Sequence, residues 1–181
     1  MLRNKLYKIC IIGDGAVGKT TILHRYVEGE FLENTKMTIG TNFYIKDLIF
    51  EDLKANIKLQ IWDLSGQTHF SSVRPGFYKG AKGIIYAFDL TRMSTFKNLI
   101  KWQKEVNKAL DKNPPSVLIG NKLDLIEKKG AINPKDIKEI NNQLDYLAYF
   151  KTSAKDNVGI QKAFEQLARD IFNYYQEKTI S

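Results

Sequence analysis

A short stretch near the amino end carries residue types that bind phosphate. Residues 13–20 read GDGAVGKT, which fits the pattern G-x-x-x-x-G-K-[ST]. Glycines allow backbone angles that a Cβ would forbid, so successive N–H groups can turn inward toward phosphate oxygens. We expect Lys19 to reach the β- and γ-phosphates of a nucleotide and the Thr20 hydroxyl to bind Mg²⁺. The alternative is a glycine-rich turn between a strand and a helix that binds nothing.

The flanking residues predict the strand and the helix that such a loop needs. Residues 8–12 (KICII) have the β-branched density of a buried parallel strand, and residues 20–27 continue at helical spacing. Farther along, strands alternate with helices, which predicts a mostly parallel sheet covered on both faces. The expected strands are 5–12, 41–50, 56–63, 83–89, 116–120 and 146–151, and the expected helices are 19–28, 94–112, 134–144 and 157–177, with a helical turn within 65–80.

The close pair of strands at 41–50 and 56–63 is joined by a short polar turn and supplies the antiparallel exception. The order of elements therefore predicts an α/β fold class with a six-stranded, mostly parallel sheet, one antiparallel strand and about five helices. With the glycine loop after its first strand, this arrangement resembles the three-layer P-loop NTPase fold.

Length and composition favour a single domain over residues 1–181. Of the 181 residues, 43% are apolar, and a chain of this size buries about 70% of its unfolded surface. No run of eighteen apolar residues and no apolar signal region at the amino end is present, so we expect neither a membrane-spanning nor a secreted protein. The single cysteine, Cys10, lies in the first predicted strand and is expected to be buried, consistent with a reducing cytoplasm.

The net charge of +8 raises nucleic acid or an anionic membrane as a partner. The charges are spread along the chain except for one row of lysines at helical spacing: Lys97, Lys101, Lys104, Lys108 and Lys112. The opposite side of that helix carries Phe96, Leu99, Gln103, Val106 and Leu110, which should face the core. The lysine row is either a solvated face or a contact for an acidic partner or a lipid surface. We expect no nucleic-acid partner.

Three more loops with polar residues follow predicted strands. They are WDLSGQ at 62–67, GNKLD at 120–124 and TSAK at 152–155. Ligands of such sheets bind beyond the carboxyl ends of the strands, so these loops and the glycine loop should build one site. Asp124 can accept both N1–H and the 2-amino group of guanine, whereas adenine presents an acceptor at N1. Alone, residues 121–124 could be an ordinary polar turn, but Ser153-Ala154-Lys155 at the next strand end favours base recognition.

In order along the chain, these motifs resemble those of the small GTPases of the Ras superfamily. The matching set is GDGAVGKT, a threonine in Thr38-Ile39-Gly40, Asp63-x-x-Gly66-Gln67, Asn121-Lys122-x-Asp124 and Ser153-Ala154-Lys155, and it covers nearly the whole chain. The flanks TIGTNF at 38–43 and FYKGA at 77–81 are most similar to the Rab branch.

The resemblance implies a set of nucleotide and metal contacts. It adds Asn121 and the Ala154 N–H as contacts to guanine, with the stems of Lys122 and Lys155 along the base and Phe31 edge-on against it. The full set expected to bind GTP or GDP is Gly15, Ala16, Val17, Gly18, Lys19, Thr20, Thr21, Phe31, Thr38, Gly66, Asn121, Lys122, Asp124, Ser153, Ala154 and Lys155. Mg²⁺ would be held by Thr20, by Thr38 when a γ-phosphate is present, and by Asp63 through water.

The same resemblance implies a switch. Gln67 is expected to orient the attacking water, Lys19 to stabilise charge, and the Gly66 N–H to touch the γ-phosphate. Loss of that phosphate should loosen segments 32–41 and 64–78, through which effectors, exchange factors and GTPase-activating proteins would bind. We expect slow intrinsic hydrolysis, accelerated by an activator that donates an arginine in trans, and a role in vesicle trafficking. Arg74 is interpreted as a surface or partner-contact residue.

Some positions depart from the family pattern. Ser65 stands where an alanine is usual, and Thr68-His69 follows Gln67 where Rab-like chains usually have a glutamate next. His69 could accept a proton, but a histidine in a mobile segment more often meets a partner or solvent. These departures favour, weakly, an alternative function: a GTP-dependent binding module with negligible hydrolysis. A small-substrate kinase is a third hypothesis, for which the assigned loops leave no acceptor site.

The last nine residues contain no cysteine and residue 2 is not glycine, so neither a prenyl nor a myristoyl anchor can be attached there. We expect a cytoplasmic monomer with no membrane anchor within this chain, peripheral to a membrane if a lipidated tail follows residue 181.

Overall fold

Six strands form one sheet in the order β2-β3-β1-β4-β5-β6. This computed structural model describes residues 2–33, 36–133, 135, 137 and 142–180. Residues 177–180 are described by their backbone only. The strands are β1 (Arg3–Ile12), β2 (Thr41–Phe50), β3 (Ala55–Leu64), β4 (Gly83–Asp89), β5 (Ser116–Asn121) and β6 (Ala148–Lys151). Only β2 runs antiparallel to its neighbour, and every other pair is parallel. The predicted mixed sheet with one antiparallel strand is confirmed.

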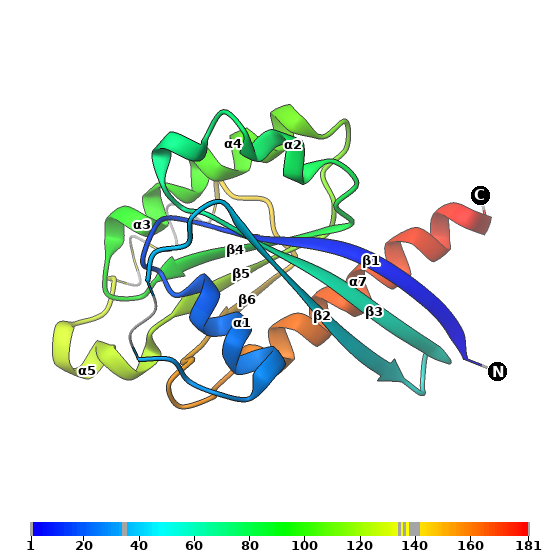
Figure 1. Cartoon of the computed structure of the whole chain (residues 1–181), viewed down its shortest axis with the longest axis horizontal. Coiled ribbons are helices and arrows are strands. Elements are labelled where there is room, and N and C mark those ends of the chain that lie inside the picture. The colour runs from blue at the N-terminus through cyan, green and yellow to red at the C-terminus, as the bar shows by residue number, and fades with distance from the viewer. Residues whose placement is uncertain (1, 34–35, 134, 136, 138–141, 181) are drawn as a thin grey trace.

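Helices cover both faces of this sheet, as Figure 1 shows with α2 and α4 above it and α1 below. Within the described residues the helices are α1 (Lys19–Glu28), α2 (Arg74–Tyr78), α3 (Met93–Lys97), α4 (Leu99–Ala109), α5 (Ile126–Lys129) and α7 (Ile160–Ile180), with single 3₁₀ turns η1 (Thr68–Phe70) and η2 (Leu123–Leu125). The predicted helix over 134–144 falls largely on residues outside the described part of the chain. No helix of the described residues is long and apolar enough to cross a membrane.

The core is divided by the sheet into two apolar clusters, because side chains alternate along each strand. On β1, Ile9 and Ile11 join the cluster under α1 and α7, while Cys10 and Ile12 join the cluster under α2, α3 and α4. Cys10 is fully buried, as predicted, and burial raises the pKa of its thiol to about 12. The central strand is therefore covered on both sides and cannot shift without disrupting both clusters.

The helix predicted over 94–112 is correct in its faces but not in its limits. It is divided at Asn98 and ends at Ala109, ahead of Pro114, which disfavours helix in the residue before it. All five lysines of the row are exposed, which confirms a solvent-facing side. Gln103 on the apolar side is buried because its amide exchanges hydrogen bonds with the backbone of Asp145, at 2.7 and 3.2 Å.

The terminal helix begins three residues later than predicted, at Ile160. Asn157 and Gly159 both adopt positive φ, at 56° and 73°, which a right-handed helix cannot contain. A Cβ at Gly159 would meet the Lys151 carbonyl oxygen at 2.4 Å, so this turn needs a glycine. The strand predicted over 146–151 is similarly shorter and begins at Ala148.

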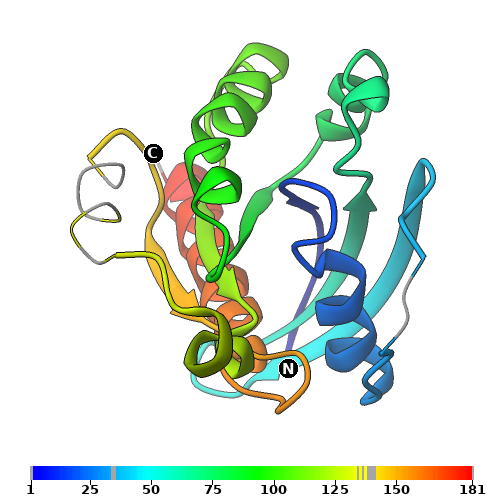
Figure 2. The same cartoon turned by 90° about the vertical axis from the view of Figure 1, so that its left-hand side faces the viewer.

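The carboxyl ends of the parallel strands lie at one edge of the sheet, and Figure 2 looks onto that edge. The described ends of the chain lie at the opposite end, where Arg3 Nη1 donates a hydrogen bond to Gln176 Oε1 at 3.1 Å (Figure 1). The loops that follow β1, β3, β4, β5 and β6 are thereby gathered on one side, where sequence analysis places the site.

Candidate functional site

A cavity of about 550 Å³ opens among the loops at the carboxyl edge of the sheet. It is lined by residues of the loops after β1, β3, β5 and β6 and by residues 31–33 and 36–38. The predicted site residues in its wall are Gly15, Ala16, Gly18, Lys19, Thr20, Thr21, Phe31, Thr38, Gly66, Gln67, Asn121, Lys122, Asp124, Ala154 and Lys155. Val17, Asp63 and Ser153 are buried behind the wall. The structure thus brings together the four motif loops that the sequence singled out.

Residues 13–18, which we call the P-loop, adopt a conformation that few other sequences allow. Gly18 has φ +94° and Ala16 has φ +59°, both in the left-handed region. Lys19, at the start of α1, is 5% exposed, and its ammonium donates to the carbonyls of Gly13 and Asp14 at 2.8 and 3.0 Å. Burial lowers its pKa to about 8, against the attraction of the Asp63 and Asp14 carboxylates. A buried ammonium at this edge favours an anionic ligand.

The loop after β3 lies directly against the P-loop. A Cβ on Gly66 would lie 2.4 Å from both Asp14 C and Gly15 N, so no side chain fits there. A ligand held by the P-loop is therefore within reach of the Gly66 backbone. Around Gly15 itself there is more space, since a Cβ there would meet only the Met37 methyl, at 3.5 Å.

A cluster of oxygen atoms lies beside Lys19. Thr20 Oγ1 donates to Asp63 Oδ2 at 2.6 Å and shares a hydrogen bond with Thr38 Oγ1 at 2.7 Å. Asp63 is fully buried, and burial raises its pKa while the bond from Thr20 opposes the shift. Its second oxygen, Oδ1, is buried without a hydrogen-bond partner among the described residues. Two hydroxyls beside an incompletely satisfied carboxylate form an oxygen donor set of the kind that Mg²⁺ prefers.

Two segments of the cavity wall are linked through the Thr38 carbonyl. It accepts hydrogen bonds from Gln67 Nε2 at 3.0 Å and from Ser65 Oγ at 2.9 Å. Ser65, which stands where the family usually has alanine, thus uses its hydroxyl to join the segments 32–41 and 64–78. Thr68 and His69 are exposed, which fits the interpretation of His69 as a solvent or partner contact.

The prediction for Arg74 was wrong, because this side chain is buried and not at the surface. Arg74 is 5% exposed and pairs with Glu105 of α4 through two hydrogen bonds of 2.9 Å. It also stacks over Trp102 at 4.2 Å and donates to the Gln67 carbonyl at 2.8 Å. Glu105 lies 31 positions away on another element, so no local pattern could reveal the pair.

At the other end of the cavity, the motif residues also hold one another. Asp124 Oδ1 accepts a hydrogen bond from Ser153 Oγ at 2.8 Å. Asn121 is 2% exposed and uses both ends of its amide, donating to the Val17 carbonyl at 3.0 Å and accepting from Thr152 at 3.0 Å. Asn121 therefore fixes the loops after β5 and β6 relative to the P-loop.

Arg25 is a positioning residue that sequence analysis missed. From the last turn of α1 its Nε donates to the Ala154 carbonyl at 2.9 Å and its Nη2 to the Lys155 carbonyl at 3.1 Å. It thereby fastens the loop after β6 to the helix that follows the P-loop. A cation near a helix C-terminus is common, so the sequence offered no signal for this role.

Comparison with known proteins identifies the family to which this chain belongs. The model of the Ras family matches residues 8–173. The chain belongs to the Ras family. Its relatives include the Ras-related protein RABA5c of Arabidopsis thaliana, 38% identical over 97% of this chain and 80% of the relative. The Ypt/Rab-type GTPase YPT7 of Saccharomyces cerevisiae is 34% identical over 98% and 86%, and the Ras-related protein Rab-10 of Diplobatis ommata 37% identical over 92% and 81%.

The family membership settles the activity in outline. This Ras-family chain is a Rab-like small GTPase: it binds guanine nucleotide, hydrolyses GTP and acts as a molecular switch. The predicted superfamily and branch are both confirmed. Neither the fold nor the relatives favour the alternative of a binding module without hydrolysis.

Proposed function

We propose that the cavity holds GTP or GDP with its phosphates on the P-loop and its base against Asp124. The observation that carries this proposal is that Lys19 and Asp124 line one cavity although they lie far apart in the sequence. A buried ammonium suits the phosphates, and a carboxylate suits the donor edge of guanine. The whole chain, residues 1–181, acts as a single monomeric domain in this proposal.

Guanine selection is proposed to depend on the second oxygen of Asp124. Ser153 occupies Oδ1, and Oδ2 has no hydrogen-bond partner among the described residues, so it can accept from the base. The Ala154 N–H and the Asn121 amide adjoin the same space, and Phe31, Lys122 and Lys155 supply its apolar walls. Adenine would leave the carboxylate facing a lone pair, and mismatches of that kind cost ~10⁴-fold in affinity.

The oxygen cluster fits Mg²⁺. Thr20 would hold the ion, Thr38 would join when a γ-phosphate is bound, and Asp63 would act through water. The bound ion would neutralise charge on the phosphate oxygens. No group of three or more histidine, cysteine or acidic side chains that could hold a metal occurs in the described part of the chain, so phosphate oxygens would complete the coordination.

Gln67 is proposed to orient the attacking water. Its Nε2 is held by the Thr38 carbonyl, which leaves Oε1 to accept a hydrogen bond from water. Lys19 and the Gly66 N–H would stabilise charge on the γ-phosphate. Arg74 is fully engaged with Glu105 and the backbone, so its guanidinium does not serve the phosphates. We therefore propose a slow intrinsic rate that an activator accelerates with its own arginine.

Partners are proposed to bind through segments 32–41 and 64–78. Exposed apolar side chains gather there and beside them: Met37, Ile39, Phe43 and Val73. Because the Gln67 side chain donates a hydrogen bond to the Thr38 carbonyl, a γ-phosphate that anchors one segment would order both. Effectors, exchange factors and GTPase-activating proteins would distinguish the ordered segments from the loosened ones during vesicle trafficking.

The proposal is tested by changing Asp124 to Asn and measuring the affinities for GDP and for xanthosine diphosphate. Asn offers one donor and one acceptor, which suits xanthine, so GDP affinity should fall by at least ~10³-fold while xanthosine diphosphate affinity rises. The exposed Asp156, changed to Asn, is the matched control and should alter neither. Unchanged GDP affinity in D124N would show that Asp124 does not bind the guanine base.

A further inference from the structure

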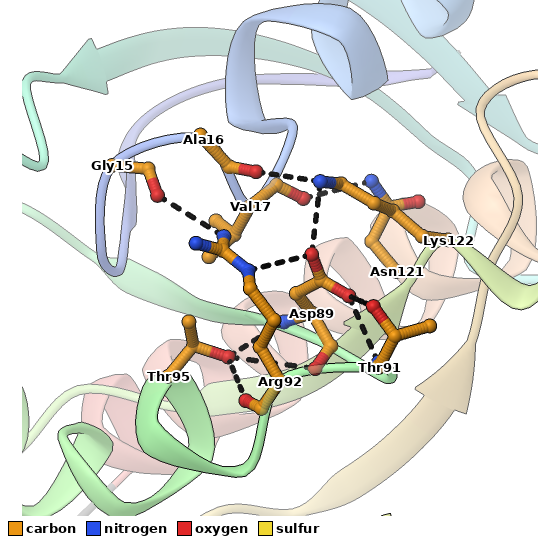
Figure 3. Close-up of polar contacts among 9 residues, drawn as sticks. All are labelled: Gly15, Ala16, Val17, Asp89, Thr91, Arg92, Thr95, Asn121 and Lys122. Atoms are coloured by element: carbon orange, nitrogen blue, oxygen red, sulfur yellow. Dashed lines mark hydrogen bonds and ion pairs between the residues drawn. The ribbon is translucent and has the colours of Figure 1, made fainter. Parts of the chain in front are cut away.

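The outer side of the P-loop carries a row of hydrogen bonds that the proposed chemistry does not use. Three consecutive P-loop carbonyls each accept one hydrogen bond from a side chain, as Figure 3 shows. The pairs are Gly15 O with Arg92 Nη2 at 3.2 Å, Ala16 O with Lys122 Nζ at 2.7 Å, and Val17 O with Asn121 Nδ2 at 3.0 Å.

These bonds fix the direction of the N–H groups on the other side of the loop. A peptide unit is planar and trans, so its N–H points opposite to its C=O. Holding the carbonyls of residues 15–17 toward the three donors therefore turns the N–H groups of residues 16–18 to the opposite side of the loop, where the phosphates would lie in the proposed complex. Ala16 and Gly18, at φ +59° and +94°, complete this arrangement of inward N–H groups, which is the geometry of an anion-binding nest.

One buried carboxylate holds two of the three donors. Asp89, at the end of β4, is 1% exposed, and its Oδ2 accepts from Lys122 Nζ and from Arg92 Nε, each at 2.9 Å. Its Oδ1 accepts from the N–H and the hydroxyl of Thr91, at 2.9 and 2.7 Å. Burial alone would raise the pKa of Asp89, but the bonds from Lys122 and Thr91 hold it below its ordinary value. The carboxylate therefore stays charged.

Arg92 is held on the outer side of the loop and is not part of the cavity wall. Its Nε is fixed by Asp89 and its Nη2 by the Gly15 carbonyl. Its side chain is 41% exposed, so it contributes little to folding. What it does reach is the peptide unit between Gly15 and Ala16, whose N–H faces the phosphates in the proposed complex.

We infer that Asp89 and Arg92 are positioning residues for phosphate binding: Asp89 sets two cations against the outside of the P-loop, and Arg92 aligns and polarises the Gly15–Ala16 peptide. This inference rests on the proposed nucleotide site. It predicts that Arg92 governs how long a nucleotide stays bound, whereas an arginine acting on the γ-phosphate would govern the hydrolysis step.

The first test is the dissociation rate of a fluorescent GDP analogue. Arg92→Gln should release the analogue roughly 3- to 10-fold faster, because it removes one partly exposed charged hydrogen-bond donor. Arg92→Lys should restore part of the retention. Asp89→Asn should have a larger effect, because Asp89 holds both Lys122 and Arg92, and adding Arg92→Gln to it should change the rate little further, because Arg92 has already lost the carboxylate that positions it. The exposed Lys97→Gln, which removes a charge from α3, is the control and should leave the rate unchanged.

The second test is spectroscopic and does not depend on Asp89→Asn folding. In the GDP complex, the amide ¹H–¹⁵N resonance of Ala16 should move in Arg92→Gln, and it should stay in place in Lys97→Gln. Unchanged dissociation with an unmoved Ala16 resonance would overturn the inference. So would slower hydrolysis with normal GDP retention, which would make Arg92 a group acting on the γ-phosphate. A wild-type chain that retained no GDP would overturn the proposed function along with it.

Discussion

Replacing Arg74 by methionine removes a buried cation while keeping much of the side-chain volume. The variant loses two hydrogen bonds to Glu105, the bond to the Gln67 carbonyl and the stack over Trp102. Breaking a buried ion pair costs about 3–5 kcal/mol, but Glu105 is 21% exposed and keeps the Tyr78 hydroxyl at 2.6 Å. We therefore expect the free energy of unfolding to fall by roughly 2–4 kcal/mol, which lowers Tm by about 5–15 °C in a domain of this size.

The assay is thermal unfolding of the GDP-bound protein, with Arg169→Met as the matched control. Arg169 also forms two hydrogen bonds to a carboxylate, that of Asp52, but both partners are at the surface, so the control should change Tm far less. Arg74→Met should also slow GTP hydrolysis, because the backbone at Gln67 is no longer held. Equal Tm changes in the two variants would refute the reasoning from burial.

Three further predictions follow from single positions. Gly15→Val should leave GDP binding intact, since a Cβ there meets only the Met37 methyl at 3.5 Å, but it should suppress single-turnover GTP hydrolysis by crowding Gln67; an unchanged rate would discredit the placement of the water. Gly66→Ala should displace the loop after β3, because its Cβ would lie 2.4 Å from P-loop backbone, and a GTP analogue should then no longer protect segment 64–78 from proteolysis. The Cys10 thiol, with its pKa raised to about 12, should react with a disulfide reagent at pH 8 only as fast as the protein opens, and bound nucleotide should slow the reaction. Fast labelling of the native protein would contradict the burial of this thiol. Because the folded state keeps the Cys10 proton to a higher pH than the unfolded state does, the contribution of the thiol to stability is complete below pH ~9 and is lost as the pH rises toward 12.

The sequence predicted what is encoded locally. The P-loop, Asp124 and Ser153 lie in motifs whose spacing follows from the chemistry of phosphate or guanine, and each motif follows a strand that its apolar pattern reveals. Parallel strands gather those loops at one edge, so the shared cavity was foreseeable from the order of elements alone.

What the sequence could not reveal are the pairs between distant elements. Arg74 looked like a surface residue because its partner, Glu105, belongs to another helix. Asp89 and Arg92 carry no motif, and their importance depends on Arg92 meeting the Gly15 carbonyl 77 positions away. The limit of α7 failed for a different reason: Asn157 and Gly159 adopt positive φ and delay the helix, and neither residue type requires that conformation wherever it occurs.

The most direct measurement is the relative affinity of the protein for GDP and ADP, determined by calorimetric titration of the nucleotide-free chain with Mg²⁺ present. If Lys19 and Asp124 grip the two ends of one nucleotide, GDP should bind at least ~10³-fold more tightly than ADP. Equal affinities, or a preference for ADP, would contradict the account.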